Sequence, residues 1–306
     1  MVTGGSRTFP LVPRYRVSGL PFGGARSTRR GRGSDLAGFR AYVPGDPIAT
    51  IDWRASAKVS SARGDDEFVV RERFADEAPS AVVVLDRRPS MGLYPDWSPW
   101  LSKPAAARAA TETIVASAIA ARGAAGYVDC ADDPVWIAPR TRAPVELILQ
   151  REETATFSAG ADAVQRGLDH LVRSGSSLGA GAFVFVLSDF LEPPPRESWL
   201  VGAGRRWELV PVVIQDRVWE QSFPAVGPVV VPLVDPHDDA VIEVRLSARE
   251  ARAERTRREH ARAELLAGFG SLGLDPVLVD ESAPERVQRA FLEWAERRRR
   301  ALWLRR

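Results

Sequence analysis

Residues 80–91, SAVVVLDRRPSM, decide the fold class of this 306-residue chain. A continuous run of apolar, mostly β-branched residues ends at Asp86, which is the pattern of a strand buried on both faces of a parallel sheet. Two later stretches repeat the pattern: AGAFVFVLSD ends at Asp189, and RWELVPVVIQD ends at Asp216. The sequence therefore predicts three buried strands that each end in an aspartate.

The segments between these strands have the pattern of helices. Residues 103–123 are rich in alanine, with Pro104 in the first turn, and residues 161–175 are amphipathic. Because parallel neighbours need helical crossovers, this order predicts an α/β fold with a doubly wound, mostly parallel sheet. The remaining predicted elements are hairpins at 124–140 and 227–247, a helix at 248–267, a strand at 275–280 and a helix at 283–300.

Composition divides the chain into four segments. Residues 1–35 are rich in Gly and Arg and predict an irregular lead-in. Residues 36–78 contain a turn at Pro44-Gly45-Asp46-Pro47 and predict an N-terminal β arm. Residues 79–216 form the predicted core, and the hairpin and helix-strand-helix of residues 217–306 are expected to complete the same fold.

Charge and composition limit the function classes. The formal net charge is only +2, and the basic residues gather at 25–33 and 297–306. These two clusters could contact nucleic-acid phosphates or an acidic membrane surface, or they could simply be solvated charges on the protein surface. The single cysteine, Cys130, excludes an internal disulfide and a Cys-rich zinc site. No stretch has the roughly 18 apolar residues of a membrane span or the pattern of a signal peptide, so a cytoplasmic location is expected. The excess of Arg over Lys and the many alanines are typical of a GC-rich bacterial gene.

The ends of the predicted strands carry the candidate chemistry. In open α/β sheets, ligands bind beyond the carboxyl ends of the strands, so Asp86 and Asp189 are expected to face one crevice with Ser90 nearby. Such hard oxygen ligands suit Mg²⁺ or Mn²⁺. The alternative is that the aspartates cap helices or bind loop amides. No histidine accompanies Ser90, Cys130 has no evident base, and there is no phosphate-binding loop motif, so the sequence predicts no catalytic residues.

Two motifs carry a family resemblance. The first is GFRAYVPGDPIATIDWRASAKVSS, residues 38–61, and the second is the pair LDRRPSM and VLSDF around Asp86 and Asp189. Together they resemble the domain-of-unknown-function-58 family and its von Willebrand factor A-like, Rossmann-type core with a metal-ion-dependent adhesion site. The signature positions that match are Tyr42, Pro44, Gly45, Asp46, Ile51, Asp52, Trp53, Ala57 and Lys58. The resemblance implies a protein partner, typically a MoxR-type AAA+ ATPase.

The chain departs from the adhesion-site pattern at two positions. Asp86 and Ser90 match the ends of Asp-x-Ser-x-Ser, but Arg88 replaces the central serine, and Ala161 stands where a threonine is expected. Only Asp86, Ser90 and Asp189 remain, so we expect a degenerate site and no bound cofactor, Mg²⁺ or Mn²⁺. An inward Arg88 would substitute for the ion, because two cations a few ångströms apart repel by several kcal/mol. An Arg88 that points to solvent is the alternative.

These features give one leading hypothesis and two rivals. The first is a non-enzymatic adaptor that acts with a MoxR-type ATPase to assemble or activate other proteins. The rivals are a Mg²⁺-dependent hydrolase using Asp86 and Asp189, and a nucleic-acid binder using the Arg-rich ends. In the signature, Trp53 is expected to anchor the arm in the core, and Asp46 and Asp52 to bind turn amides. A partner-binding or nucleotide-sensing role is the alternative.

Overall fold

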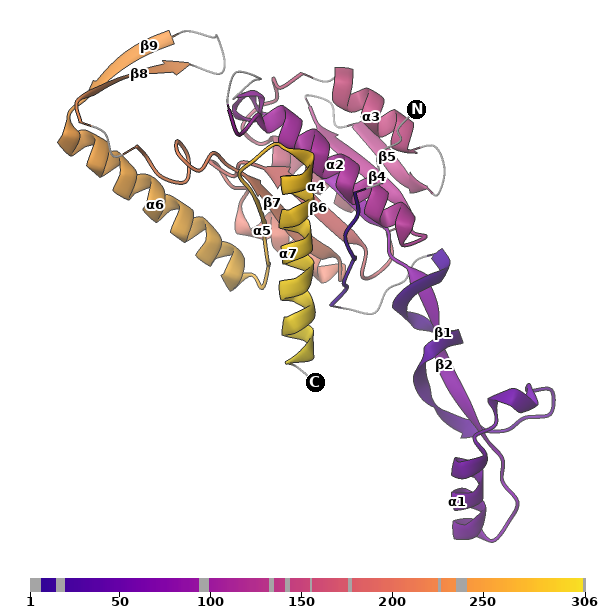
Figure 1. Ribbon diagram of the computed structural model, residues 1–306. Coiled ribbons are helices and arrows are strands. Elements are labelled where there is room, and N and C mark those ends of the chain that lie inside the picture. Colours follow the sequence, from indigo (N-terminus) through magenta and orange to yellow (C-terminus); the bar gives the residue numbers. More distant parts are fainter. Residues whose placement is uncertain are drawn as a thin grey trace.

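The centre of the computed structural model is a six-stranded sheet with the order β10-β7-β6-β3-β4-β5 (Figure 1). Neighbouring strands are parallel except β4 and β5, which form an antiparallel hairpin. The strands are β3 (Ala81–Asp86), β4 (Ala125–Cys130), β5 (Val135–Arg140), β6 (Phe183–Ser188), β7 (Glu208–Ile214) and β10 (Val277–Val279). The structure describes residues 7–14, 20–93, 99–131, 135–140, 144–154, 156–175, 178–224, 227–234 and 241–304. The predicted mixed α/β fold with a mostly parallel sheet is confirmed.

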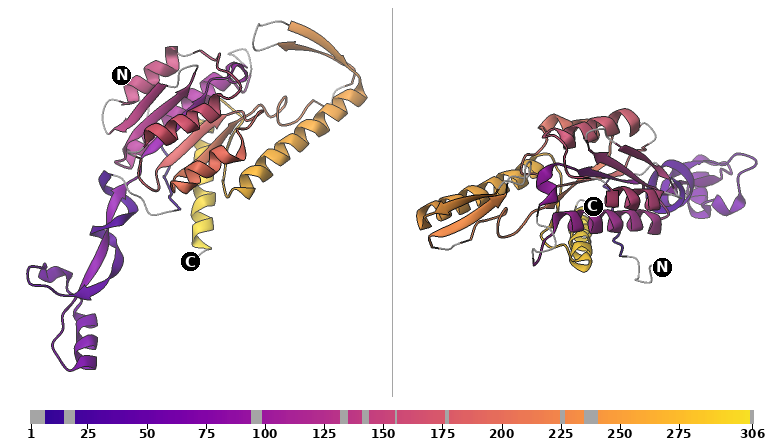
Figure 2. Two further views of the ribbon diagram at one scale, coloured as in Figure 1. Left: turned by 180° about the vertical axis from the view of Figure 1, so that it is seen from behind. Right: turned by 90° about the horizontal axis from the view of Figure 1, so that it is seen from above.

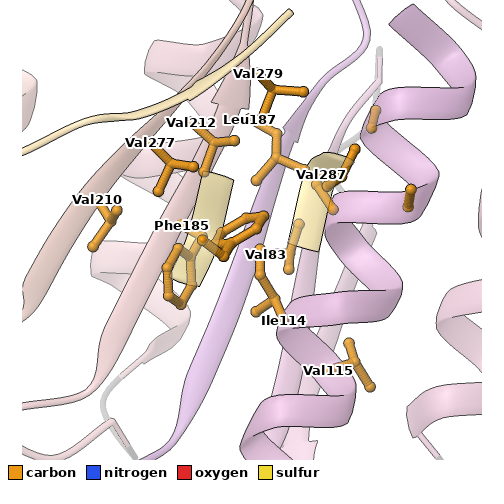
Figure 3. Close-up of a cluster of buried hydrophobic side chains, with 14 of the residues drawn as sticks. Val83, Ile114, Val115, Phe185, Leu187, Val210, Val212, Val277, Val279 and Val287 are labelled. Carbon is orange, nitrogen blue, oxygen red and sulfur yellow. The ribbon is translucent and has the colours of Figure 1, made fainter. Parts of the chain in front are cut away.

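Helices cover both faces of the sheet and bury its alternating side chains. One face packs against α2 (Lys103–Ala120), α3 (Pro144–Thr154) and α7 (Pro284–Trp303), and the other against α4 (Ala163–Ser174) and α5 (Arg196–Gly204). Val83 and Phe185 point into the first layer, as Figure 3 shows, whereas Val84 belongs to the second. Burial on both faces explains why these strands are continuous apolar runs.

The N-terminal lead-in is partly core. Residues 7–14 have no regular secondary structure, but Phe9 is buried and stacks on Phe291 of α7, with 4.7 Å between the ring centroids. The expectation of an irregular lead-in as far as residue 35 is wrong for residues 20–35, which belong to β1 (Leu20–Ala41). This strand pairs with β2 (Val69–Ala78) through four register shifts, so its sequence lacks the regular alternation of a strand.

The paired strands β1 and β2 form an arm that projects away from the sheet (Figure 1). At its far end the chain forms the short 3₁₀ helix η1 (Ile48–Thr50) and the helix α1 (Trp53–Arg63), which the sequence analysis did not predict. Asp52 caps α1 by accepting a hydrogen bond from the backbone of Ala55 at 3.0 Å. The arm is therefore a hairpin with a helical insertion.

A second projection leaves the sheet on the side opposite the arm (Figure 2). It consists of the hairpin β8 (Val229–Val234) and β9 (Val241–Leu246) and the long helix α6 (Ala248–Ser271). The hairpin forms a two-stranded sheet of its own, so only β10 and α7 of the C-terminal segment complete the central fold. Within the described ranges, no helix has the length and apolar character needed to cross a bilayer.

Close packing of α4 on the sheet gives a first prediction. A Cβ added to Gly167 would lie 2.1 Å from the Sγ of Cys130 and 3.3 Å from Val84, so Gly167→Ala is expected to lower the free energy of unfolding by about 1–3 kcal/mol. A Cβ added to Gly268 in α6 has no atom within 4 Å, so Gly268→Ala is expected to raise the free energy of unfolding by up to about 1 kcal/mol. Urea unfolding of both variants tests these two expectations. Equal changes in the free energy of unfolding would contradict the close packing of α4 on the sheet.

Candidate functional site

The carboxyl ends of β3 and β6 meet at the centre of the sheet. From β3 the chain continues to β4 on one side, while β6 lies on the other, so the strand order reverses between them. Asp86 ends β3 and Asp189 follows β6, and both are fully buried. The sheet order thus places both carboxylates where open α/β sheets bind ligands.

The guanidinium of Arg88 lies against the carboxylate of Asp86. Its Nε donates to Asp86 Oδ2 at 2.9 Å and its Nη2 donates to the same oxygen at 2.7 Å, while the Arg88 backbone N–H donates to Oδ1 at 2.9 Å. The Nη2 atom also lies 3.7 Å from Asp189 Oδ1. Arg88 is 5% exposed, and it takes the inward orientation of the two considered above.

The hydroxyl of Ser188 completes this half of the site. It donates to Asp86 Oδ2 at 2.8 Å and accepts hydrogen bonds from Arg88 Nη2 at 3.2 Å and from the backbone N–H of Phe190 at 2.9 Å. Asp86 thus accepts hydrogen bonds from both Arg88 and Ser188, and Arg88 and Asp86 form a hydrogen-bonded ion pair inside the protein.

A second cation, Lys103, lies beside Asp189. Its Nζ donates to Asp189 Oδ2 at 2.9 Å, to Glu220 Oε1 at 2.5 Å and to the backbone carbonyl of Ser90 at 3.0 Å. The side chain of Lys103 is 0% exposed. The site therefore contains two cations and three carboxylates.

Lys103 and Glu220 are not among the site residues predicted from the sequence, although the sequence holds one signal for Lys103. Lys103 is the first residue of α2, where the helix dipole disfavours a positive charge. It is also one of only two lysines in the chain, the other being Lys58. A lysine at that position indicates a carboxylate nearby. Glu220 lies in the loop after β7 and carries no comparable signal.

The pKa directions follow from burial and from the cations. Burial raises the pKa of Asp189, but the ammonium of Lys103 and the hydroxyl of Ser90 more than offset it, so the pKa lies below its usual value. Burial, with the charge of Asp189, keeps the pKa of Glu220 above its usual value despite Lys103. Burial lowers the pKa of Lys103, but Asp189 and Glu220 raise it further. The lysine therefore stays charged.

These side chains, as arranged, do not fit a divalent cation. A metal at this position would take its protein oxygens from Asp86, Ser90 and Asp189, and both carboxylates already bind a cationic nitrogen within 3 Å. A metal ion beside Arg88 and Lys103 would repel both. Ala161, at the expected threonine position, is exposed and has no side-chain oxygen. In the part of the chain that the structure describes, no group of three or more His, Cys, Asp or Glu side chains forms a metal site.

The third strand-end aspartate serves its own loop. Asp216 Oδ1 accepts hydrogen bonds from the backbone N–H groups of Val218 at 2.7 Å and Trp219 at 2.9 Å. Its backbone N–H in turn donates to Glu220 Oε2 at 2.7 Å, which fixes the carboxylate that contacts Lys103. Asp216 therefore follows the alternative in which a strand-end aspartate binds loop amides.

The adjacent Arg87 belongs to a different buried network. It donates to the hydroxyl of Tyr127 at 2.9 Å and pairs with Glu152 at 3.1 Å and with Asp129 at 3.4 Å. Tyr127 also donates to Glu152, whose pKa burial raises. Two consecutive buried arginines therefore neutralise two separate acidic clusters.

The signature motif lies on the arm, away from the strand ends (Figure 1). Gly45 has φ 108°, which suits glycine, and Asp46 Oδ2 accepts from the backbone of Val43 at 2.9 Å. The expectation that Trp53 anchors the arm in the core is wrong, because Trp53 is 60% exposed and contacts Phe68 edge-on. Tyr42 and Pro44 belong to the same exposed tip, and Asp52 is the cap of α1.

The contact between Arg40 and Asp46 gives a second prediction. Two hydrogen bonds, at 2.6 and 2.7 Å, and the Val43 amide lower the pKa of Asp46 to about 2. Arg40→Ala is therefore expected to raise the Asp46 pKa toward 3.8. Carboxyl carbon chemical shifts followed by NMR against pH measure it, and an unchanged titration would contradict the pairing.

The Arg-rich ends divide between core and surface. Arg298 of the C-terminal cluster is buried, pairs with Glu208 and donates to the carbonyl of Val12 at 2.7 Å. Arg299 and Arg300 are exposed. The side chains of residues 25–33 lie outside the described residues. One arginine predicted as surface charge is therefore structural.

Comparison with known proteins places the chain in a family. No curated protein matches it. A conserved hypothetical protein BatB from Bacteroides thetaiotaomicron is similar at 15% identity and a TM-score of 0.38, covering 71% of this chain and 99% of that one. An aerotolerance-related membrane protein from Bacteroides fragilis is similar at 13% identity and a TM-score of 0.39, covering 72% and 99%. These likenesses carry no further conclusion. The family model "Protein of unknown function DUF58" matches residues 38–264, so the chain belongs to the DUF58 family.

Proposed function

We propose that this protein is a non-enzymatic interaction module with a von Willebrand A-like core and a degenerate adhesion site, and that it acts with a MoxR-type AAA+ ATPase in the cytoplasm to assemble or activate other proteins. The observation that carries the proposal is that Arg88 and Lys103 bind the carboxylates of Asp86 and Asp189 at the carboxyl edge of the sheet. A site filled by the protein's own cations keeps a positive charge there without a cofactor.

Arg88 has one contact that a partner can replace. Its Nη1 donates to the carbonyl of Glu192 at 3.0 Å and lies 3.7 Å from Glu192 Oε2, whose side chain is 75% exposed. A pair this long and this exposed contributes little stability. In the proposed mechanism a carboxylate of the partner displaces Glu192 and binds Arg88, in the role that a metal-bound carboxylate has in an intact adhesion site.

The rival functions have less support. For a Mg²⁺-dependent hydrolase, Asp86 and Asp189 would have to release Arg88 and Lys103 before binding metal, which leaves two buried cations unpaired. For a nucleic-acid binder, the C-terminal cluster offers fewer surface arginines than the sequence suggests, because Arg298 is buried against Glu208 while Arg299 and Arg300 are exposed.

Binding to a MoxR-type ATPase from the same genome, measured by calorimetry on the full chain, tests the proposal. Arg88→Ser is expected to weaken binding at least about tenfold, whereas Glu192→Ala, which removes the competing carboxylate, leaves it equal or tighter. Glu197→Ala, which removes an exposed acid in the first turn of α5, is the matched control and is expected to change nothing. Absence of any complex at micromolar concentrations would overturn the proposal.

A further inference from the structure

The hairpin of β8 and β9 is a sheet of two strands only. Among the described residues no third strand pairs with it, and it lies on the second projection, apart from the central sheet (Figure 2). Val241 and Ile242 of β9 are 63% and 60% exposed. Two strands alone are marginally stable, and an exposed apolar edge is a template for a further strand. The hairpin is therefore an incomplete sheet.

The two edges of the hairpin differ. The sequence of β8 has a proline at position 232, which has no N–H to donate, and prolines within sheets are confined to edges. The sequence of β9, VIEVRL, contains neither proline nor glycine. In the part of the chain that the structure describes, β9 has no backbone hydrogen bonds to any strand other than β8. The edge of β9 is therefore the one that can accept a strand.

The strand β9 carries one charge of each sign. Glu243 and Arg245 are exposed and lie two residues apart, so they share one face of the strand. The residues opposite them on β8, Pro232 and Val230, carry no charge. Neither Glu243 nor Arg245 forms an ion pair with another side chain that the structure describes. Opposite charges on one strand give it no net attraction to an anionic membrane, but they suit a strand of complementary pattern.

An antiparallel copy of β9 has that complementary pattern. When two identical strands pair about a two-fold axis perpendicular to the sheet, one residue lies opposite itself. Centring the pair on Val244 places Glu243 of each copy opposite Arg245 of the other. The same register places Ile242 opposite Leu246 on the other face. Centring the pair on Glu243 or on Arg245 instead places two like charges opposite each other, which is destabilising. Charges on an edge strand usually oppose pairing, but one register here satisfies both of them.

We propose that β9 pairs with β9 of a second copy of this protein in the register centred on Val244, which makes a four-stranded antiparallel sheet. The ladder hydrogen bonds of both strands and two Glu243–Arg245 ion pairs stabilise the contact. Because the contact is isologous, it closes as a dimer and leaves only the two β8 edges, each of which contains a proline. The dimer does not use the strand-end site, so it is independent of the proposed function.

Sedimentation velocity of the full chain at increasing protein concentration is the first test. The unaltered protein is expected to form a dimer and nothing larger. Glu243→Arg and Arg245→Glu each turn both opposite-charge pairs into like-charge pairs, so each is expected to weaken dimerisation at least about tenfold. An equimolar mixture of these two variants restores opposite charges across the contact and is expected to form a one-to-one dimer. Arg252→Glu makes the same charge reversal at an exposed position of α6 and is expected to dimerise like the unaltered protein.

Disulfide formation tests the register. Directly opposite residues of antiparallel strands have Cα atoms about 4.5–5.5 Å apart, which a disulfide spans. Val244→Cys is therefore expected to form an intermolecular disulfide under mild oxidation. Ile242→Cys is the control: residue 242 is 60% exposed, but about 13 Å of strand separates it from its own copy, so no disulfide is expected. The native Cys130 is buried and does not compete.

Three results would overturn the proposal. The first is a protein that stays monomeric at every concentration. The second is a dimer that neither charge reversal weakens, or a mixture of the two variants that forms no dimer. The third is cross-linking of Ile242→Cys in preference to Val244→Cys.

Discussion

Replacing Lys103 by methionine is expected to lower the free energy of unfolding by about 3–5 kcal/mol. Methionine keeps the length of the side chain but removes the charge that Asp189 and Glu220 share. Glu220 then remains buried without a cation and Asp189 keeps only its 3.7 Å contact with Arg88, which is the costly half of a broken ion pair. Chemical denaturation at neutral pH measures the loss. The chain's other lysine offers a matched control, since Lys58 is exposed and Lys58→Met is expected to change stability by less than about 0.5 kcal/mol.

The pH dependence of the same variant gives a second readout. In the unaltered protein the pKa of Asp189 is lowered, so its contribution to stability is present above the unfolded pKa and is lost as the pH falls. Without Lys103, burial raises the pKa of both carboxyls above their unfolded values, and stability is lost as the pH rises. The deficit of Lys103→Met is therefore expected to shrink toward acidic pH. A deficit that is independent of pH, or that grows in acid, would contradict the ion-pair account.

Replacing Arg88 by serine is expected to destabilise the protein by about 3–5 kcal/mol in metal-free buffer, because Asp86 loses its guanidinium partner. The same change restores the order Asp-x-Ser-x-Ser and removes one of the two cations. Mn²⁺ is therefore expected to bind the variant and recover part of the loss, about 2.7 kcal/mol at one hundred times the dissociation constant. Thermal unfolding with and without Mn²⁺ measures the recovery.

Arg87→Ser is the matched control for this experiment. Arg87 is equally buried and next in sequence, but its partners are Tyr127, Asp129 and Glu152. The expected loss of stability is comparable, and no recovery in Mn²⁺ is expected. Recovery in both variants, or in neither, would show that Arg88 does not stand in for an ion.

The strands of the central sheet could be predicted from the sequence, but the structure of the projecting arm could not. Strands buried on both faces, such as β3 and β6, are continuous apolar runs, and their helical crossovers follow from parallel pairing. The arm has neither signal. Apart from Trp53 and Val59, the helix α1 consists of small, polar or charged residues, and its one buried position is Ser56, so no apolar period marks it. The strand β1 pairs through register shifts that remove its alternation.

The site was predictable in its anions but not in all of its cations. Asp86 and Asp189 follow from the rule that ligands bind at strand ends. Arg88 was a candidate because it lies between Asp86 and Ser90, but the sequence left open whether it points inward or to solvent. Lys103 comes from the start of a helix that is distant in sequence from both aspartates, and only the sheet order brings it to Asp189. Trp53 was misjudged because a large aromatic residue is usually buried, whereas here it lies at the tip of a projecting arm.

The central claim is that Arg88 and Lys103 stand where a metal ion would bind. Anomalous diffraction from crystals of the unaltered protein and of Arg88→Ser, both soaked in Mn²⁺, tests it most directly. The account predicts no anomalous peak between Asp86 and Asp189 in the unaltered protein and a peak there in Arg88→Ser. A peak between these two carboxylates in the unaltered protein, with Arg88 turned to solvent, would contradict it.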